Sequence, residues 1–332
     1  MNKNISMIGA GSWGTALAIL LAKSGYKVKM WSCFDDEREM INNLKEHKEK
    51  LPGIKIPDGV LCTGDIKEAL SGSDMVVMVV PSHTIRENAK KISSYIKNET
   101  IIVNCSKGIE TQTGLRLSQA IKEEIPNANL VTLSGPSHAE EVAKGIPTTV
   151  VAASENVNAA ELVQDVFMTP LFRVYTNPDI IGVEIGGALK NVIALCAGIS
   201  DGLGFGDNTK AALMTRGLAE ISRLGISMGA NPQTFAGLSG IGDLIVTCTS
   251  MHSRNRRAGI LIGQGKAPQK AMEEVKMVVE GVTTTKAAYK LAKRKNVTMP
   301  ITFEAYEVLF NGKDAKSAVN DLMMRNKKDE VF

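Results

Sequence analysis

The sequence predicts an α/β fold, in which a doubly wound, mostly parallel N-terminal sheet is followed by an all-α C-terminal domain. Short β-branched runs alternate with helical patterns through the first half of the chain. The run at residues 75–80 is apolar at every position, which is typical of a strand covered by helices on both faces. After Pro178 the pattern takes a helical period that Gly, Asn and Pro interrupt.

The first half supplies the strands and helices of the predicted sheet. Seven runs have strand character, and several of the gaps between them have helical spacing. We expect strands at 5–8, 27–31, 75–80, 101–104, 130–133, 149–153 and 172–175, and helices at 15–23, 37–43, 85–95, 115–123 and 157–167.

The second half is predicted to be helical, with a doubtful strand at 244–247 as its exception. Gly25 and Gly229 each follow a predicted helix, where a left-handed residue is needed to end it. A chain of 332 residues exceeds the usual size of one hydrophobic core, so we expect two domains, 1–180 and 181–332. The helices of the second domain are expected at 183–197, 209–228, 254–264, 283–293, 302–310 and 315–324.

Composition and net charge limit the classes of partner that the protein can have. A hydrophobic content of 44% and a charged content of 22% are ordinary for a globular protein. The net charge of +4 is too small to predict nucleic-acid binding. The five cysteines are odd in number and widely spaced, which predicts a reducing compartment rather than disulfides or metal ligands.

The sequence predicts no membrane span and a cytoplasmic localisation. The longest apolar stretch, residues 182–199, carries Glu184, Lys190 and Asn191, which a bilayer-spanning helix would not tolerate. The chain runs into its first predicted strand without the pattern of a signal peptide.

A glycine motif joins the first predicted strand to the first helix and predicts a dinucleotide site. Gly9 permits a tight turn, Gly11 lets the backbone approach a pyrophosphate, and Gly14 lets the helix pack closely on the strand. Backbone N–H groups and the helix dipole then face the phosphates. Ser12 and Trp13 lie in the same turn, so we expect them at the cofactor, and the domain is predicted to be of the Rossmann type.

The tip of the second strand leaves the choice of nucleotide open. An acidic residue there binds the ribose 2′-hydroxyl of NAD, whereas an arginine accommodates the 2′-phosphate of NADP. The tip carries Cys33, Asp35 and Asp36, with no basic residue before Arg38, which favours NAD. The two acids can equally be the solvated start of the next helix.

Further blocks of sequence, in the same order along residues 5 to about 310, resemble one family. The chain is similar to the bacterial type of the NAD(P)-dependent glycerol-3-phosphate dehydrogenases. The resembling blocks are Gly9-Ala10-Gly11-Ser12-Trp13-Gly14-Thr15-Ala16-Leu17-Ala18, Cys105-Ser106-Lys107-Gly108-Ile109-Glu110, Leu133-Ser134-Gly135-Pro136-Ser137-His138-Ala139, Glu184-Ile185-Gly186-Gly187-Ala188-Leu189-Lys190-Asn191, Leu238-Ser239-Gly240-Ile241-Gly242-Asp243-Leu244, Ser253-Arg254-Asn255 and Val279-Glu280-Gly281-Val282.

The resemblance implies reversible hydride transfer between NAD(P)H and dihydroxyacetone phosphate, giving sn-glycerol 3-phosphate for phospholipid synthesis. It also implies a homodimer. Family members that use NADPH often carry Arg or His at the tip of the second strand, where this chain has Ser32 and Cys33. A strict preference for NADPH is therefore not expected.

Lys190 and Asp243 are the leading catalytic candidates. Lys190 interrupts an apolar helical face, where a lysine tends to have a lowered pKa, although its head could instead extend into water. Asp243 lies in a glycine-rich turn and could alternatively cap the following segment. The resemblance implies that Lys190 accepts the proton in glycerol phosphate oxidation and that Asp243 orients it at the substrate.

Lys107 and residues 253–255 complete the predicted site. Lys107 follows an apolar run at its carboxyl end, where ligands bind in open α/β sheets, or it is an ordinary surface lysine. Ser253 can cap a helix, and Arg254 offers a charged fork for a phosphate. The resemblance implies that Lys107 contacts both cofactor and substrate. It implies that Ser253, Arg254 and Asn255 contact glycerol phosphate, with Arg254 also reaching the cofactor.

The remaining expected contacts come from the resemblance alone. It implies substrate contacts by Gly135, Ser137 and Asn191, and cofactor contacts by Cys33, Ala139, Val278 and Glu280. Arg256 and Arg257 are assigned no role. The four histidines (His47, His83, His138 and His252) lack an acidic partner at a recognisable spacing, so we interpret them as loop or wall residues and predict no metal site.

Two other functions remain open. A β-hydroxyacid dehydrogenase would keep the fold and the catalytic lysine but would not need the phosphate cradle at residues 253–255. A redox sensor would bind the dinucleotide without turnover, and it would have no use for Lys107, Lys190 and Asp243 together.

Overall fold

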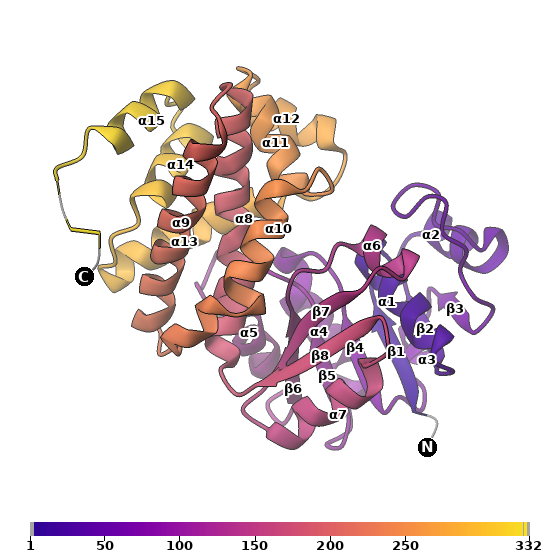
Figure 1. Cartoon of the computed structure of the whole chain (residues 1–332). Coiled ribbons are helices and arrows are strands. Elements are labelled where there is room, and N and C mark those ends of the chain that lie inside the picture. Colours follow the sequence, from indigo (N-terminus) through magenta and orange to yellow (C-terminus); the bar gives the residue numbers. More distant parts are fainter. Residues whose placement is uncertain (1–2, 328, 331–332) are drawn as a thin grey trace.

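The computed structural model describes residues 3–327 and 329–330, and its first half is an eight-stranded sheet in the order β3-β2-β1-β4-β5-β6-β7-β8 (Figure 1). All neighbours pair in parallel except β6 and β7, which pair antiparallel. The sheet is therefore mostly parallel and doubly wound, as predicted. Its strands are β1 Asn4–Ile8, β2 Lys27–Trp31, β3 Val60–Thr63, β4 Met75–Met78, β5 Ile101–Asn104, β6 Asn129–Ser134, β7 Thr148–Ala153 and β8 Phe172–Asn177.

Helices cover both faces of the sheet because alternate strand residues point to opposite sides. Ile5 and Met7 of β1 join the cluster under α1, α6 and α7, whereas Ile8 joins the cluster under α3, α4 and α5. The helical segments of this half are α1 Ser12–Lys23, α2 Asp35–Glu39, a π-helix Met40–Leu44, α3 Ile66–Leu70, α4 Ile85–Ile92, α5 Leu117–Glu124, α6 Ala139–Lys144 and α7 Val157–Phe167, with 3₁₀ turns at Ser82–Thr84 and Ser93–Tyr95.

The elements described after β8 are helical, and α8 is their central element. Figure 1 shows α8 leading from the sheet into the middle of the helical domain. These elements are α8 Ile180–Gly202, α9 Asp207–Ser227, a 3₁₀ turn Pro232–Ala236, a π-helix Leu238–Gly242, α10 Asp243–Thr249, α11 Arg254–Gly263, α12 Pro268–Val275, α13 Glu280–Lys295, α14 Pro300–Phe310 and α15 Ala315–Met323.

Glycines let α11 cross α8 at close range. A Cβ on Gly198 would lie 2.1 Å from the Arg256 carbonyl oxygen, and one on Gly259 would lie 2.1 Å from that of Leu195. Among the described residues, one helix, α8, is long and apolar enough to cross a membrane. However, 89% of its apolar 18-residue segment is buried inside the protein. It is the core helix of the second domain.

The seven predicted strands are all present, and several short elements differ from the prediction. The edge strand β3 was not predicted, because it has four residues and leaves Leu61 exposed, so its pattern is weak. Residues 244–247 form part of α10 rather than a strand. The short helices α3, α6 and α12 were also not among the predicted helices. Gly25 and Gly229 both have positive φ after a helix, as expected.

Candidate active site

The glycine turn after β1 has the geometry that its three positions require. Gly9 has φ +108°, and a Cβ there would lie 2.5 Å from the Val79 carbonyl oxygen. A Cβ on Gly14 would lie 2.5 Å from the Gly9 carbonyl oxygen, so this glycine allows α1 to pack on the turn. A Cβ on Gly11 would meet nothing within 4 Å. The fold itself does not require Gly11, and the open space beside it fits a bound pyrophosphate.

Ser12 and Trp13 begin α1 directly at this turn. Ser12 is buried, and Trp13 is half-buried against the hydrophobic cluster of the sheet. The turn lies at the carboxyl end of β1, beside β4, where the strand order reverses. Such a switch point is where ligands bind in open α/β sheets.

The folded chain brings Arg38 back to the tip of β2, six residues before it in the sequence. Arg38 folds back so that its Nη1 donates to the Ser32 carbonyl at 2.8 Å, and it also pairs with Asp35. Lys50 pairs with the buried carboxylate of Glu37, and its ammonium lies 5.9 Å from the centre of the Phe34 ring.

Cys33 is exposed at the same tip. The tip therefore carries Arg38 at the Ser32 carbonyl and Lys50 near the Phe34 ring, the two residues that flank Cys33 in the sequence, and it is not the purely acidic tip expected for NAD alone.

Lys107, Lys190 and Asp243 meet in one buried cluster at the junction of the two domains. Lys190 Nζ donates to Asp243 Oδ1, and Lys107 Nζ donates to Asp243 Oδ2 at 2.6 Å. Lys190 is 6% exposed and Asp243 is 1% exposed. Lys190 does not extend into water, and the carboxylate of Asp243 binds two ammonium groups rather than capping α10, so neither alternative interpretation holds.

The pKa values of the cluster follow from its burial. Burial lowers the pKa of Lys190 to about 8; Asp243 opposes this shift, and Lys107 adds to it. Burial acts to raise the pKa of Asp243, but the ammonium groups of Lys107 and Lys190 outweigh it and hold that pKa below its ordinary value. The cluster thus contains a lysine that can exchange a proton near neutral pH beside a carboxylate whose charged form the two lysines favour.

Thr247 is a member of the cluster that the sequence interpretation missed. Its hydroxyl accepts from Lys190 Nζ at 2.7 Å and donates to the Asp243 carbonyl at 2.6 Å. The four-residue spacing from Asp243 would have revealed it if residues 243–249 had been recognised as a helix.

Lys107 is fixed by the loop that follows β6. Its Nζ also donates to the Gly135 carbonyl at 3.0 Å, and Ser137 Oγ donates to the same oxygen at 3.0 Å. Gly135 has φ +143°, and a Cβ there would lie 2.9 Å from Val150 Cα, so the turn requires glycine. Lys107 is therefore held in the cluster and is not a free surface lysine.

Residues 253–255 begin α11. Ser253 caps this helix, and its Oγ accepts from the Arg256 N–H at 3.2 Å. Burial lowers the pKa of Arg254, against the opposing carboxylates of Glu280 and Glu140. A capped helix start beside a desolvated guanidinium is suited to an anion.

The two predicted asparagines also hold helices together. Asn255 Nδ2 donates to Asn191 Oδ1 at 2.9 Å, and the Gly281 N–H donates to Asn255 Oδ1 at 2.8 Å. This chain of amides links α8, α11 and α13. Arg256, which was assigned no role, bonds to Asp201 at 2.8 Å and supports the same helix start.

Two carboxylates of the helical domain clamp it onto the sheet domain. Glu280 Oε1 accepts from the Ser82 N–H at 3.0 Å, just after β4. Glu184 pairs with Arg116 and accepts from the Ser118 N–H at 2.8 Å at the start of α5. Of the other predicted cofactor contacts, Ala139 is buried at the start of α6 and Val278 is exposed beside Glu280.

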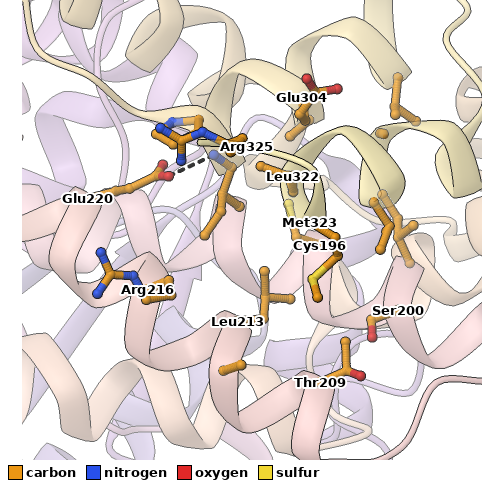
Figure 2. A pocket seen from close by; sticks show the side chains of 18 of the residues that line it. Cys196, Ser200, Thr209, Leu213, Arg216, Glu220, Glu304, Leu322, Met323 and Arg325 are labelled. Carbon is orange, nitrogen blue, oxygen red and sulfur yellow. Dashed lines mark hydrogen bonds between the residues drawn. The ribbon is translucent and has the colours of Figure 1, made fainter. Parts of the chain in front are cut away.

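A cavity of about 410 Å³ lies elsewhere in the helical domain, between α8, α9, α14 and α15 (Figure 2). Its lining is mostly apolar, with Arg216, Glu220 and Arg325 toward one end. None of the predicted site residues lines it. In the described part of the chain there is also no group of His, Cys, Asp and Glu that could hold a metal ion.

Comparison with known proteins gives consistent matches along the chain. Residues 4–160 match the family model for the N-terminus of NAD-dependent glycerol-3-phosphate dehydrogenase, and residues 179–320 match the model for its C-terminus. A glycerol-3-phosphate dehydrogenase (NAD(P)+) of Desulfitobacterium hafniense is 58% identical over 98% of this chain and 93% of its own length. One from Clostridium perfringens is 57% identical over 98% of both chains.

Solved structures agree with the sequence matches. The crystal structure of glycerol-3-phosphate dehydrogenase from Coxiella burnetii superposes with a TM-score of 0.94 at 37% identity, covering 97% of this chain and 99% of that one. D-mandelate dehydrogenase superposes with a TM-score of 0.64 at 13% identity, covering 95% and 99% of the two chains, and shares the fold alone.

Proposed function

We propose how the site residues divide the work of catalysis, on the premise that the chain belongs to the NAD-dependent glycerol-3-phosphate dehydrogenase family. The protein is an oxidoreductase that transfers hydride reversibly between NAD(P)H and dihydroxyacetone phosphate, giving sn-glycerol 3-phosphate. The observation that carries the proposal is the buried cluster of Lys107, Lys190 and Asp243.

Lys190 is proposed as the proton donor to the substrate carbonyl and as the acceptor in the reverse direction. A pKa of about 8 lets its ammonium and amine forms coexist near neutral pH, which general acid–base catalysis requires. Asp243 and Thr247 orient its Nζ. The bound nicotinamide supplies or accepts the hydride.

Lys107 is proposed to stand between cofactor and substrate. Its ammonium shares Asp243 with Lys190, and its repulsion contributes to the lowered pKa of Lys190. The Gly135 carbonyl, bonded to Lys107 and Ser137, fixes its position. Lys107 therefore polarises the site while Lys190 moves the proton.

The start of α11 is proposed to hold the substrate phosphate through Ser253, Arg254 and Asn255, with Asn191 beside them. Arg254→Ala should raise the substrate KM about 10- to 100-fold with little loss of kcat, as expected for a lost charged hydrogen bond. Arg173→Ala serves as the control, because Arg173 lies on the edge strand β8. An unchanged KM in Arg254→Ala would count against the phosphate cradle.

The cofactor is proposed to lie across the glycine turn, with Gly9, Gly11, Ser12, Trp13 and Gly14 at its pyrophosphate. The open space beside Gly11 supports this position. Further contacts are proposed for Cys33, Lys107, Ala139, Arg254, Val278 and Glu280. Because the β2 tip carries cations as well as acids near Cys33, we propose that it accepts both NAD and NADP.

The finer organisation of the protein is also proposed. The domain boundary at 180/181 is supported by the end of β8 at Asn177 and the start of α8 at Ile180. A homodimer, a cytoplasmic localisation and supply of glycerol phosphate to phospholipid synthesis follow from the family. Light scattering that gave the mass of one chain would contradict the dimer.

Steady-state kinetics test the function directly. NADH and NADPH oxidation would be measured with dihydroxyacetone phosphate and with tartronate semialdehyde. We expect turnover with the phosphorylated ketone. Activity on tartronate semialdehyde alone would indicate a β-hydroxyacid dehydrogenase, and NADH binding without any turnover would indicate a redox sensor.

A further inference from the structure

His138 lies where the two domains meet, although it was interpreted as a loop or wall residue. It immediately precedes α6, and its ring centroid lies 5.7 Å from that of His252 in the helical domain. His252 directly precedes Ser253, and the charges of Lys190 and Asp243 both act on His138. His138 therefore stands near both the catalytic cluster and the proposed phosphate cradle.

One nitrogen of His138 has no partner. Its Nε2 is buried and has no hydrogen-bond partner among the residues that the structure describes. Buried polar atoms in folded proteins are nearly always paired, so an unpaired one next to a reaction site calls for a ligand group. Leaving such an atom unpaired has a cost, which a matching substrate group removes.

The protonation of His138 decides which kind of group Nε2 can bind. Burial lowers the pKa of His138, and repulsion from Lys190 lowers it further, while Glu140, Asp243 and the Val246 carbonyl oppose the shift. The imidazole is therefore neutral at pH 7, with one donor and one acceptor nitrogen. Because the Val246 backbone favours a protonated ring nitrogen and Nε2 has no partner, we assign the proton of the neutral ring to Nδ1, which makes Nε2 an acceptor.

We propose that His138 Nε2 accepts a hydrogen bond from the free primary hydroxyl of the substrate and so selects ketones that carry this hydroxyl. This inference rests on the proposed function. Dihydroxyacetone phosphate has three polar groups: a carbonyl for Lys190, a phosphate for residues 253–255, and one hydroxyl that no residue has yet been assigned. The phosphate is an acceptor and would be repelled by an acceptor nitrogen, whereas the hydroxyl donates.

A substrate that lacks this hydroxyl gives the sharpest test. Hydroxyacetone phosphate is dihydroxyacetone phosphate with a methyl group in place of the hydroxymethyl group. A site built to bind a hydroxyl rejects the analogue without it, because the buried site atom is then left unpaired. The ratio of kcat/KM for the two ketones would be measured for the wild type, His138→Leu, His138→Gln and His252→Leu.

The proposal predicts a particular pattern of ratios. In His138→Leu the preference for dihydroxyacetone phosphate should fall about 10- to 100-fold, mainly because kcat/KM for this substrate falls. His138→Gln should retain most of the preference, since its amide oxygen can accept the same hydrogen bond. His252→Leu should leave the ratio unchanged. In the wild type the preference should weaken at acid pH as His138 becomes protonated, because Nε2 then becomes a donor.

Other outcomes would overturn the proposal. An equal loss on both ketones in His138→Leu would mean that His138 contacts the phosphate or supports the structure. An unchanged kcat/KM for both ketones would mean that His138 contacts neither the hydroxyl nor the phosphate. If His138→Leu fails to fold, which loss of NADH binding would show, His138→Gln gives the test. A retained preference that no longer weakens at acid pH supports the proposal, because glutamine does not titrate, and a ratio near one overturns it. If the wild type reduces neither ketone, the proposed function itself fails.

Discussion

The glycine turn and the lysine–aspartate cluster are two parts of one active site that are built in different ways. The turn takes its three glycines from residues 9–14: Gly9 and Gly14 have backbone atoms where a Cβ would lie, and Gly11 leaves open space. In the cluster, Asp243 lies 136 positions after Lys107 and 53 after Lys190, and the three meet only because α8 packs against both α10 and β6, beside the Lys107 side chain. The cofactor site is thus a property of one segment, whereas the proton-transfer site is a property of the domain junction.

Removing the amine of Lys190 should distinguish the proton-transfer cluster from the cofactor site more strongly than any other change. Lys190→Ala should lower kcat by two or more orders of magnitude, because a proton-transfer group contributes about 10²–10⁴-fold. The dissociation constant for NADH, measured by fluorescence titration, should barely change. Lys210→Ala is the control, since Lys210 is a largely buried lysine paired with Asp201 on another helix. Near wild-type turnover in Lys190→Ala would remove this residue from its role.

The pH profile should report the same lysine without a mutation. The pKa of Lys190 is lowered to about 8 by burial, so the amine form predominates only above that pH. For glycerol phosphate oxidation, kcat/KM should rise about tenfold per pH unit below 8 and then level off. Reduction needs the ammonium form and should decline above pH 8. A profile with no inflection between pH 7 and 9 would contradict the assignment.

Two alanine substitutions should divide the glycine turn into a structural and a binding position. Gly9→Ala should destabilise the fold by about 1–3 kcal/mol, because of its positive φ and the close Val79 carbonyl. Gly11→Ala should leave the melting temperature unchanged and weaken NADH binding about tenfold, or about 1.4 kcal/mol. Thermal unfolding and fluorescence titration measure the two effects. A Gly11→Ala protein that binds NADH normally would show that no phosphate occupies this space.

The smallest effect is expected at the tip of β2. Arg38→Ala should raise the KM for NADPH about two- to fivefold, as expected for a partly exposed charge, and change that for NADH little. Cys33→Ser, which keeps size and neutrality, serves as the control. An equal change for both nucleotides would indicate that Arg38 only supports the backbone of the tip through Ser32.

The sequence predicted the long, strongly patterned elements and failed at short ones. Strand β4 is an apolar run, and β1 is rich in Ile and Met and leads into a helical pattern, so their positions follow from the local sequence. Residues 244–247 were ambiguous because a short apolar run fits either a strand or a buried helix. Helix α10 forms because Asp243 is held by the lysines of two other segments and Leu244 packs into the helical core.

The candidate site shows the same limit. Residue type and motif indicated Lys190, Asp243 and Arg254, and the structure brings the first two into contact. Thr247 was missed, and His138 was interpreted as a loop or wall residue, because neither lies in a motif that assigns it a role. What distinguishes them is visible only in the folded chain: Thr247 accepts a hydrogen bond from the Lys190 ammonium, and His138 Nε2 is buried without a hydrogen-bond partner among the described residues.

The sequence by itself determined the class of fold, the dinucleotide turn and the family, because these depend on local spacing and on motifs that follow one another along the chain. Only the tertiary structure decided the protonation of Lys190, the return of Arg38 to the β2 tip and the unpaired nitrogen of His138. A pKa and an unpaired atom depend on burial and on charges brought from distant segments, and burial exists only once the chain has folded.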